Sequence, residues 1–162
     1  MEIERKFLVK YLPEGLDKVP FTDIRQSYIS IEPVIRIRKA DDEYILTIKG
    51  KGDISREEKE IFISRREYEN LRKKVETREV VKRRYFYPLE DGHMAQIDIY
   101  EGGLEGFRIV EVEFETLEEA KAFAPPAFFG KDVSRIDDYK NVKLALYGLP
   151  KGAEYVKKAK LR

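Results

Sequence analysis

The chain has 162 residues, and 39% of them are charged, yet the formal net charge is only +1. A general nucleic-acid-binding protein normally carries a marked basic excess, so this balance argues against that class, although it leaves a local basic channel open. The absence of cysteine excludes a disulfide framework and thiol chemistry. No apolar run reaches the roughly 18 residues of a membrane span. The sequence therefore predicts a cytoplasmic protein with a single domain over 1–150 and a basic tail over 151–162.

The opening stretch, Met1–Val9, has the alternation of a β-strand. Successive side chains of a strand point to opposite faces, so this strand would carry one charged and one apolar face. The charged face holds Glu2, Glu4 and Lys6. In most proteins such a face lies in water, and this strand alone would indicate nothing more.

Six later segments repeat the division between a polar and an apolar face, and 22–31 is predicted as one further strand. The polar faces carry Arg36 with Arg38, Lys49 with Lys51, Glu58 with Glu60, Lys82 with Arg84, Gln96 with Asp98, and Glu111 with Glu113 and Glu115. Most of these strands carry charges of one sign, although neighbouring like charges repel. Surface strands usually mix the two signs, so this segregation is unusual for a solvated sheet.

Two architectures satisfy the pattern: an ordinary sheet with its charged face in water, and a closed barrel with charges inside and apolar residues outside under helices. The segregation of signs favours the barrel, because acidic and basic strands can then meet different parts of one highly charged ligand. Carboxylates hold divalent cations through oxygen, and Arg and Lys bind phosphate oxygens. With no cysteine and one histidine, a carboxylate-only set favours Mg²⁺ or Mn²⁺ over zinc.

Three segments are predicted as helices. Ser64-Arg65-Arg66-Glu67 is a capping box that starts a helix running to about Glu76, and Thr116 caps a second helix that ends before a Pro-Pro pair. These two helices can cover the apolar outside of a barrel. Residues 137–147 could form a third helix. His93, the only histidine, falls in a turn and is predicted to be exposed to solvent.

Motifs along nearly the whole chain resemble one known family. The opening Glu2-Ile3-Glu4-Arg5-Lys6 matches the Glu-x-Glu-x-Lys signature of the triphosphate tunnel metalloenzymes, or CYTH superfamily, which includes inorganic triphosphatases, thiamine triphosphatases and class IV adenylyl cyclases. Further segments resemble the family in family order: Arg25-Gln26-Ser27-Tyr28-Ile29, Arg36-Ile37-Arg38, Leu46-Thr47-Ile48-Lys49-Gly50, Arg56-x-Glu58-x-Glu60, Lys82-x-Arg84-Tyr85, Ile97-Asp98, Glu111-Val112-Glu113 and Tyr139-x-Asn141-x-x-Leu144-Ala145.

The chain departs from the family near its C-terminus. Asp138 stands where an arginine is common, so the basic group expected there would have to come from Arg135, Lys140 or Lys143. The resemblance implies that this segment closes one end of a tunnel, with Tyr28 as its contact.

The resemblance implies an α+β fold with a closed, mainly antiparallel eight-stranded β-barrel, or tunnel, with a charged lumen and helices packed outside. By the family pattern, the phosphate-binding residues are Lys6, Arg36, Arg38, Lys49, Lys82 and Arg84. The metal ligands are Asp98, Glu111 and Glu113 for one cation, and Glu2 with Glu4 for a second or for positioning water. Glu4 and Lys49 are the candidates for a catalytic role, Lys49 as a base. Glu58 and Glu60 are either ligands or partners of the basic residues.

The predicted function is metal-dependent hydrolysis of a linear triphosphate, with inorganic tripolyphosphate as the favoured substrate and Mg²⁺ or Mn²⁺ as the cofactor. A thiamine triphosphatase, and a class IV adenylyl cyclase with Tyr28, Phe86 or Tyr100 stacking on the base, are alternatives on the same scaffold. A non-catalytic module that binds polyphosphate or triphosphorylated RNA ends is another, and so is a charge network that only stabilises the fold. The expected partner is a small-molecule triphosphate, with no membrane and no general nucleic-acid binding; a homodimer is compatible with the sequence.

Overall fold

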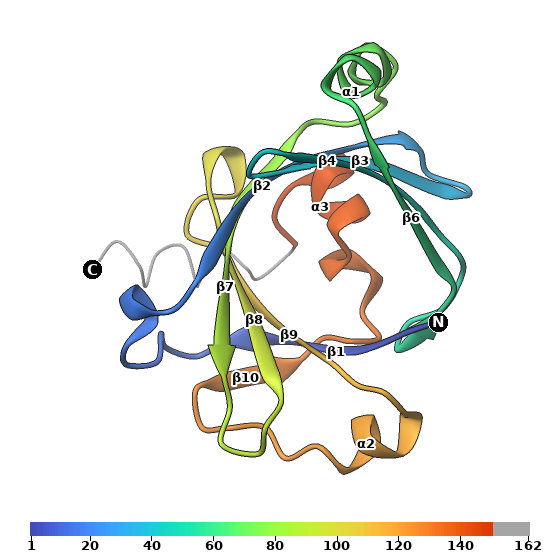
Figure 1. The fold of residues 1–162 in the computed structure, drawn as a ribbon. Helices are drawn as coiled ribbons and strands as arrows, with labels where there is room; N and C mark the ends of the chain where they lie inside the picture. The colour runs from blue at the N-terminus through green and yellow to red at the C-terminus, as the bar shows by residue number, and fades with distance from the viewer. Residues whose placement is uncertain (151–162) are drawn as a thin grey trace.

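The structure, a computed structural model, describes residues 1–150; the predicted basic tail at 151–162 lies outside the described residues. Within the described range, ten strands form one strongly curved antiparallel sheet, accompanied by three α-helices (Figure 1). The strands are β1 (Glu2–Val9), β2 (Phe21–Ser30), β3 (Val34–Ala40), β4 (Glu43–Lys49), β5 (Ser55–Arg56), β6 (Glu58–Ile63), β7 (Val80–Pro88), β8 (Met94–Tyr100), β9 (Arg108–Glu113) and β10 (Phe129–Asp132). The helices are α1 (Arg65–Arg72), α2 (Leu117–Ala122) and α3 (Asn141–Tyr147), and 3₁₀ turns lie at Leu16–Lys18, Gly102–Leu104 and Asp137–Tyr139.

The strand order is β10-β1-β9-β8-β7-β2-β3-β4-β6, and β5 pairs with β1. A mainly antiparallel sheet with helices confirms the predicted α+β class, and all eight predicted strands are present. The structure adds β5 and β10, which have two and four residues. Such short strands show too few alternations for a period of two to be recognised in the sequence.

Strands β5 and β6 contact different neighbours although they are almost continuous in the chain. β5 pairs with the first residues of β1, whereas β6 pairs with β4 along its whole length. Only Glu57 separates the two strands, and its carbonyl accepts a hydrogen bond from the Gly50 N–H at 2.8 Å. The chain therefore lies beside both β1 and β4 within this short stretch.

The largest hydrophobic cluster lies on the convex side of the sheet, which faces away from the charged residues of the strands. It joins apolar side chains of β1, β8 and β9 to residues of α2, β10 and the segment between them. Phe7, for example, is 1% exposed and packs against Phe123 and Phe129. The Arg5 side chain joins β1 to α2 by donating a hydrogen bond to the Ala120 carbonyl at 2.8 Å. The largest part of the core thus lies outside the curve of the sheet, as a charged interior requires.

Helix α1 begins at the predicted capping box. The Ser64 hydroxyl accepts a hydrogen bond from the Glu67 N–H at 3.1 Å, and the Glu67 carboxylate accepts one from the Ser64 N–H at 2.8 Å. The helix ends at Arg72 rather than near Glu76, because the Glu76 N–H donates to the Tyr28 carbonyl in β2 at 2.8 Å and so leaves the helical ladder. Figure 1 shows α1 on the outside of the strands, as predicted.

Helix α3 does not lie outside the sheet as α1 and α2 do; it belongs to the segment that the family resemblance assigns to one end of a tunnel, with Tyr28 as its contact. Figure 1 shows α3 within the curve of the strands, and it shares a buried cluster with Tyr28 of β2 and Tyr100 of β8. The predicted helix over 137–147 is divided into a 3₁₀ turn and α3, because Lys140 adopts an extended conformation (φ −69°, ψ 141°). No helix in residues 1–150 is long and apolar enough to cross a membrane.

His93 is not simply an exposed turn residue. Its imidazole lies 2.9 Å from the Asp91 carboxylate and 3.7 Å from that of Glu119, and it packs edge-on against Phe114 and Phe123. The hydrogen bond to Asp91 raises the pKa of His93 above its ordinary value of 6.5. His93 therefore links the β7–β8 hairpin to helix α2.

We expect replacement of His93 by glutamine to destabilise the protein in a pH-dependent way. Because the pKa of His93 is raised in the folded state, its positive charge stabilises the fold. This stabilisation is complete below the ordinary pKa of histidine and is lost as the pH rises through the folded-state pKa. The difference in unfolding free energy between wild type and variant should therefore be largest near pH 5.5 and smallest near pH 9, at most about 1 kcal/mol as for other partly exposed ion pairs. Urea denaturation at the two pH values measures it. An equal difference at both would contradict the ion pairing.

Candidate active site

A cavity of about 100 Å³ lies on the concave side of the sheet, and charged side chains dominate its wall. Strands from both ends of the strand order contribute, so the sheet curls around this space. The charged lining residues are Glu2, Glu4, Lys6, Arg36, Arg38, Lys49, Arg56, Glu58, Glu60, Arg84, Glu111, Glu113 and Lys140. The remaining lining residues are Tyr28, Val34, Asn141 and Val142. Every predicted site residue except Lys82 and Asp98 lies on this wall.

Two arginines of β3, Arg36 and Arg38, face the cavity without a carboxylate partner within 4.0 Å among residues 1–150. Arg36 is 4% exposed, donates to the Thr47 hydroxyl at 3.3 Å, and has a buried Nε atom with no acceptor. Arg38 donates to the Gln26 side-chain oxygen at 3.0 Å. Burial, together with repulsion from Arg36 and Arg84, lowers the pKa of Arg38 to about 9. Enclosed charges without counter-charges are costly, so this pair favours binding of an anion.

A group of three carboxylates lies on the same wall. Glu2, Glu4 and Glu113 each place one oxygen within 4.8 Å of the others. Burial raises the pKa of Glu4 to about 8, and repulsion from Glu111 and Glu2 adds to the shift. Burial also raises the pKa of Glu2 and of Glu113. A divalent cation would relieve this crowding of negative charge, and a set of carboxylate oxygens fits Mg²⁺ or Mn²⁺.

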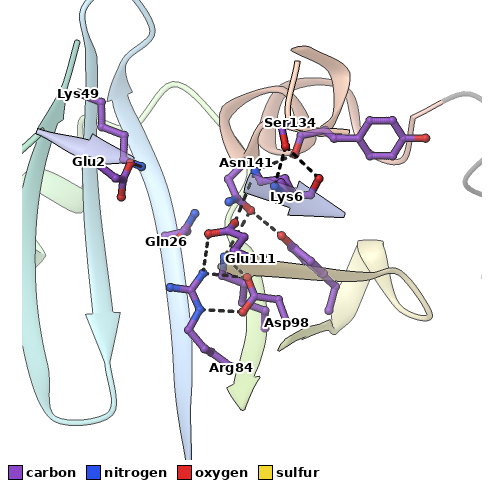
Figure 2. Close-up of polar contacts among 12 residues, drawn as sticks. Glu2, Lys6, Gln26, Lys49, Arg84, Asp98, Glu111, Ser134 and Asn141 are labelled. Atoms are coloured by element: carbon purple, nitrogen blue, oxygen red, sulfur yellow. Dashed lines mark hydrogen bonds and ion pairs between the residues drawn. The ribbon is translucent and has the colours of Figure 1, made fainter. Parts of the chain in front are cut away.

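Asp98 and Lys82 lie beneath the wall rather than on it. Both side chains are 0% exposed, and their charged groups are 2.8 Å apart. Asp98 also accepts two hydrogen bonds from Arg84, at 2.8 and 2.9 Å (Figure 2). Burial opposes ionisation of Asp98, but Arg84 and Lys82 hold its pKa below the ordinary value. Asp98 and Lys82 therefore do not line the cavity, where they were predicted as a metal ligand and a phosphate-binding residue. Each is instead paired with an oppositely charged group in the interior.

Glu111 connects this buried pair to the cavity. It is 5% exposed, and its oxygens lie 3.5 Å from the Lys6 ammonium and 3.7 Å from the Arg84 guanidinium. Burial would raise the pKa of Glu111, but Lys6 and Arg84 together hold it well below the ordinary value. Lys6 also donates to the Tyr139 carbonyl at 3.2 Å. Glu111 thus keeps Lys6 and Arg84 close together on the wall.

Lys49 lies between two carboxylates, 3.3 Å from Glu2 and 3.3 Å from Glu58. Burial, followed by repulsion from Arg36, lowers the pKa of Lys49. Glu58 is therefore engaged with a basic residue, which was one of its two predicted roles. Glu60 instead accepts a hydrogen bond from the Thr47 hydroxyl at 3.4 Å.

Near the C-terminus, Lys140 is the basic residue that reaches the cavity. Its ammonium pairs with Asp53 at 3.0 Å and Asp137 at 3.1 Å, and donates to the Gly52 carbonyl at 3.3 Å. Of the other two candidates for this position, Arg135 is exposed and does not line the cavity, and Lys143 lines a neighbouring pocket instead.

Two polar residues of the wall, Arg56 and Asn141, were not among the predicted site residues, although both belong to motifs of the family resemblance. Arg56 lies 3.7 Å from Glu2, and its place two residues before Glu58 could have identified it, since alternate residues of an extended chain share a face. Strand alternation could not identify Asn141, because this residue belongs to α3.

The aromatic residues suggested for stacking on a nucleoside base are mostly unsuited to that role. Tyr100 is 1% exposed, and Phe86 does not line the cavity. Tyr28 does line it, but is 2% exposed and belongs to the cluster around α3. The described residues therefore provide no exposed aromatic ring at the cavity.

Comparisons with known proteins agree with this geometry. No protein-family model matches the chain. The chain is 43% identical over 151 residues to an inorganic triphosphatase of Nitrosomonas europaea, and the match covers 90% of this chain and 97% of that protein. The crystal structure of the inorganic triphosphatase NE1496 matches with a TM-score of 0.70 and 37% identity, covering 93% of this chain and 97% of the other. The Hippeastrum protein HpAC1, described as having a dominant triphosphatase activity, shares the fold with a TM-score of 0.55 and 16% identity, over 75% of this chain and 83% of its own. The chain therefore belongs to the inorganic triphosphatase family within the triphosphate tunnel metalloenzyme, or CYTH, superfamily.

Proposed function

We propose that the protein is a metal-dependent triphosphatase that hydrolyses inorganic tripolyphosphate in the charged cavity. The observation that carries this proposal is the enclosed pair Arg36 and Arg38, which has no carboxylate partner within residues 1–150 and faces the same cavity as three crowded carboxylates. A small, highly charged anion accompanied by a divalent cation matches both sets. The activity of the Nitrosomonas europaea relative supports the same substrate.

The sheet would enclose this substrate as a tunnel. Pairing of β5 with β1 and of β6 with β4 supports closure, because Glu57 alone separates β5 from β6. Near the cavity β1 is paired with β5 and β4 is paired with β6, so neither strand presents a free edge there. Closure would limit the access of water to the bound phosphates.

Glu2, Glu4 and Glu113 would hold Mg²⁺ or Mn²⁺, which supplies charge neutralisation for the phosphate oxygens and lowers the pKa of a bound water. Charge builds up on the leaving oxygen during phosphoryl transfer, so catalysis depends mainly on positioning and electrostatic stabilisation. Arg36 and Arg38 would bind phosphate oxygens without first giving up a carboxylate partner.

The remaining wall residues divide between substrate binding and proton transfer. Lys6 and Arg84 would exchange part of their contact with Glu111 for phosphate oxygens. Lys49 and Glu4 are the residues proposed for orienting water or accepting its proton. Burial lowers the pKa of Lys49, which favours the neutral amine that can accept a proton. Glu4 would orient water beside the cation that it helps to hold.

Orthophosphate and pyrophosphate release tests the proposal. Purified protein would be given tripolyphosphate, thiamine triphosphate or ATP with Mg²⁺ or Mn²⁺, and cyclic AMP would be measured in parallel. We expect metal-dependent orthophosphate release, fastest from tripolyphosphate. Cyclic AMP with pyrophosphate would instead identify a cyclase, and saturable binding without turnover would identify a binding module.

Replacing Glu113 by glutamine is expected to lower kcat/KM for tripolyphosphate by at least about 100-fold, because one carboxylate of the proposed metal set is lost. The matched control is Glu115→Gln, two residues further along, which is exposed and does not line the cavity. Titration with Mn²⁺ should show weaker binding for the Glu113 variant and unchanged binding for the control. Equal metal affinity in both variants would exclude Glu113 as a ligand.

A further inference from the structure

Asn141, the first residue of α3, is the one uncharged polar residue other than Tyr28 on the cavity wall. Its side-chain oxygen accepts a hydrogen bond from the Tyr100 hydroxyl at 2.7 Å and lies 3.4 Å from the Lys82 ammonium. Figure 2 shows Asn141 close to Lys6 and Glu111, above Asp98 and Arg84. The residue thus connects the C-terminal helix to the charged groups of β1, β7, β8 and β9.

Two donors determine which way the amide of Asn141 faces. Tyr100 is completely enclosed, and burial raises its pKa well above the ordinary value, so its hydroxyl stays protonated. The Lys82 nitrogen lies 2.8 Å from the Asp98 carboxylate and donates to the Asn141 side-chain oxygen at 3.4 Å. If the amide were reversed, its N–H groups would face the Lys82 nitrogen, and its oxygen would lose the hydrogen bonds from Tyr100 and Lys82. The oxygen therefore faces Tyr100 and Lys82.

This orientation leaves the amide nitrogen of Asn141 as an unused donor. The hydrogen bonds of Asn141 within residues 1–150 engage only its oxygen, and its nitrogen is not among the buried atoms that lack a partner. The side chain lines the cavity, so the nitrogen remains available to a ligand there. An amide N–H can bind a phosphate oxygen without adding a further positive charge to a wall that already carries several.

We infer that Asn141 is a phosphate-binding residue whose amide N–H donates to a triphosphate oxygen, and that Tyr100 is a positioning residue that holds this amide in place. The inference rests on the proposed triphosphatase function and adds a binding group from outside the charged strands. It also gives α3 a direct part in the site, because the helix supplies a ligand contact as well as packing against Tyr28.

The test compares KM and kcat for tripolyphosphate with saturating Mg²⁺, and the dissociation constant of non-hydrolysable imidotriphosphate, in three variants. Asn141→Ala should raise both KM and the dissociation constant about tenfold, because a hydrogen bond to an anion is lost. Tyr100→Phe removes one hydroxyl outside the cavity and should raise both about threefold with kcat nearly unchanged. In the Asn141→Ala background, Tyr100→Phe should have no further effect on KM, since it acts through Asn141.

Tyr87→Phe is the matched control. The Tyr87 hydroxyl donates to the Glu14 carbonyl at 2.9 Å, away from the cavity, so this variant also loses one tyrosine hydrogen bond. Its KM should equal that of wild type. The inference would be overturned if the KM of Tyr87→Phe rose as much as that of Tyr100→Phe. It would also be overturned if Asn141→Ala and Tyr100→Phe both kept the wild-type KM. Failure of the proposed function would be distinct, because wild type itself would then release no phosphate. Tyr100→Phe keeps the test decisive if Asn141→Ala does not fold.

Discussion

Replacing Asp98 by alanine is expected to lower the free energy of unfolding by about 3–5 kcal/mol, the usual effect of removing one partner from a buried ion pair. Asp98 and Lys82 are both 0% exposed, and Arg84 donates two hydrogen bonds to the same carboxylate. Without Asp98, two basic groups would remain close together with Glu111 as their nearest counter-charge. Urea denaturation with a spectroscopic readout measures the change.

The chain offers a close control for Asp98 on the outer face of β2 and β7. Asp23 accepts two hydrogen bonds from Arg83, at 2.8 and 3.2 Å, but the side chains are 53% and 38% exposed. Asp23→Ala should therefore cost less than about 1 kcal/mol. If Asp98→Ala were no more destabilising than Asp23→Ala yet lost metal binding, Asp98 would be a metal ligand, as the family pattern suggests, rather than a structural anion.

Replacing Arg36 by methionine should have the opposite combination of effects. We expect kcat/KM for tripolyphosphate to fall by about 100- to 1,000-fold, the usual loss when one group that stabilises transition-state charge is removed. Stability should be unchanged or higher, because Arg36 is 4% exposed, has no carboxylate partner within the described residues, and has a buried Nε atom without an acceptor. Methionine keeps much of the volume and removes the isolated charge.

Steady-state kinetics and thermal unfolding, with and without tripolyphosphate and Mg²⁺, test this expectation. The ligand should stabilise wild type more than Arg36→Met, because the arginine contributes to binding. Arg83→Met, on the outer face, is the control and should keep full activity. An inactive Arg36 variant that is also destabilised by more than about 2 kcal/mol would show that Arg36 supports the fold instead.

Alternation along the strands was enough to predict which residues share a face, because the period of a strand is two. It correctly grouped Glu2 with Glu4 on one strand and Arg36 with Arg38 on another, and both pairs line the cavity. Alternation does not show which residues of a face line the cavity and which are buried beneath its wall. Lys82 and Asp98 have the predicted facing, but they lie where Asn141 and α3 cover the concave side, and the position of that helix depends on tertiary packing.

Two predicted helix boundaries are wrong because residues near them contact partners that are distant in the sequence. α1 ends early because the Glu76 N–H finds the carbonyl of Tyr28, which is 48 residues away in the sequence. Lys140 interrupts the third predicted helix where its ammonium reaches Asp53 and Gly52 in the loop before β5. Propensity and capping patterns describe only near neighbours, so neither interruption could be predicted from them.

The sheet carries its hydrophobic cluster on one face and its cavity on the other, which limits how the chain can tolerate length changes. Insertion of a single residue in the middle of β1 would reverse the facing of every side chain beyond it. Lys6 would then point into the layer occupied by Phe123 and Phe129, and Phe7 would point into the cavity. The fold and the anion site would be lost together, whereas changes of length in the connecting loops would spare both. Insertions that are tolerated should therefore fall between the strands.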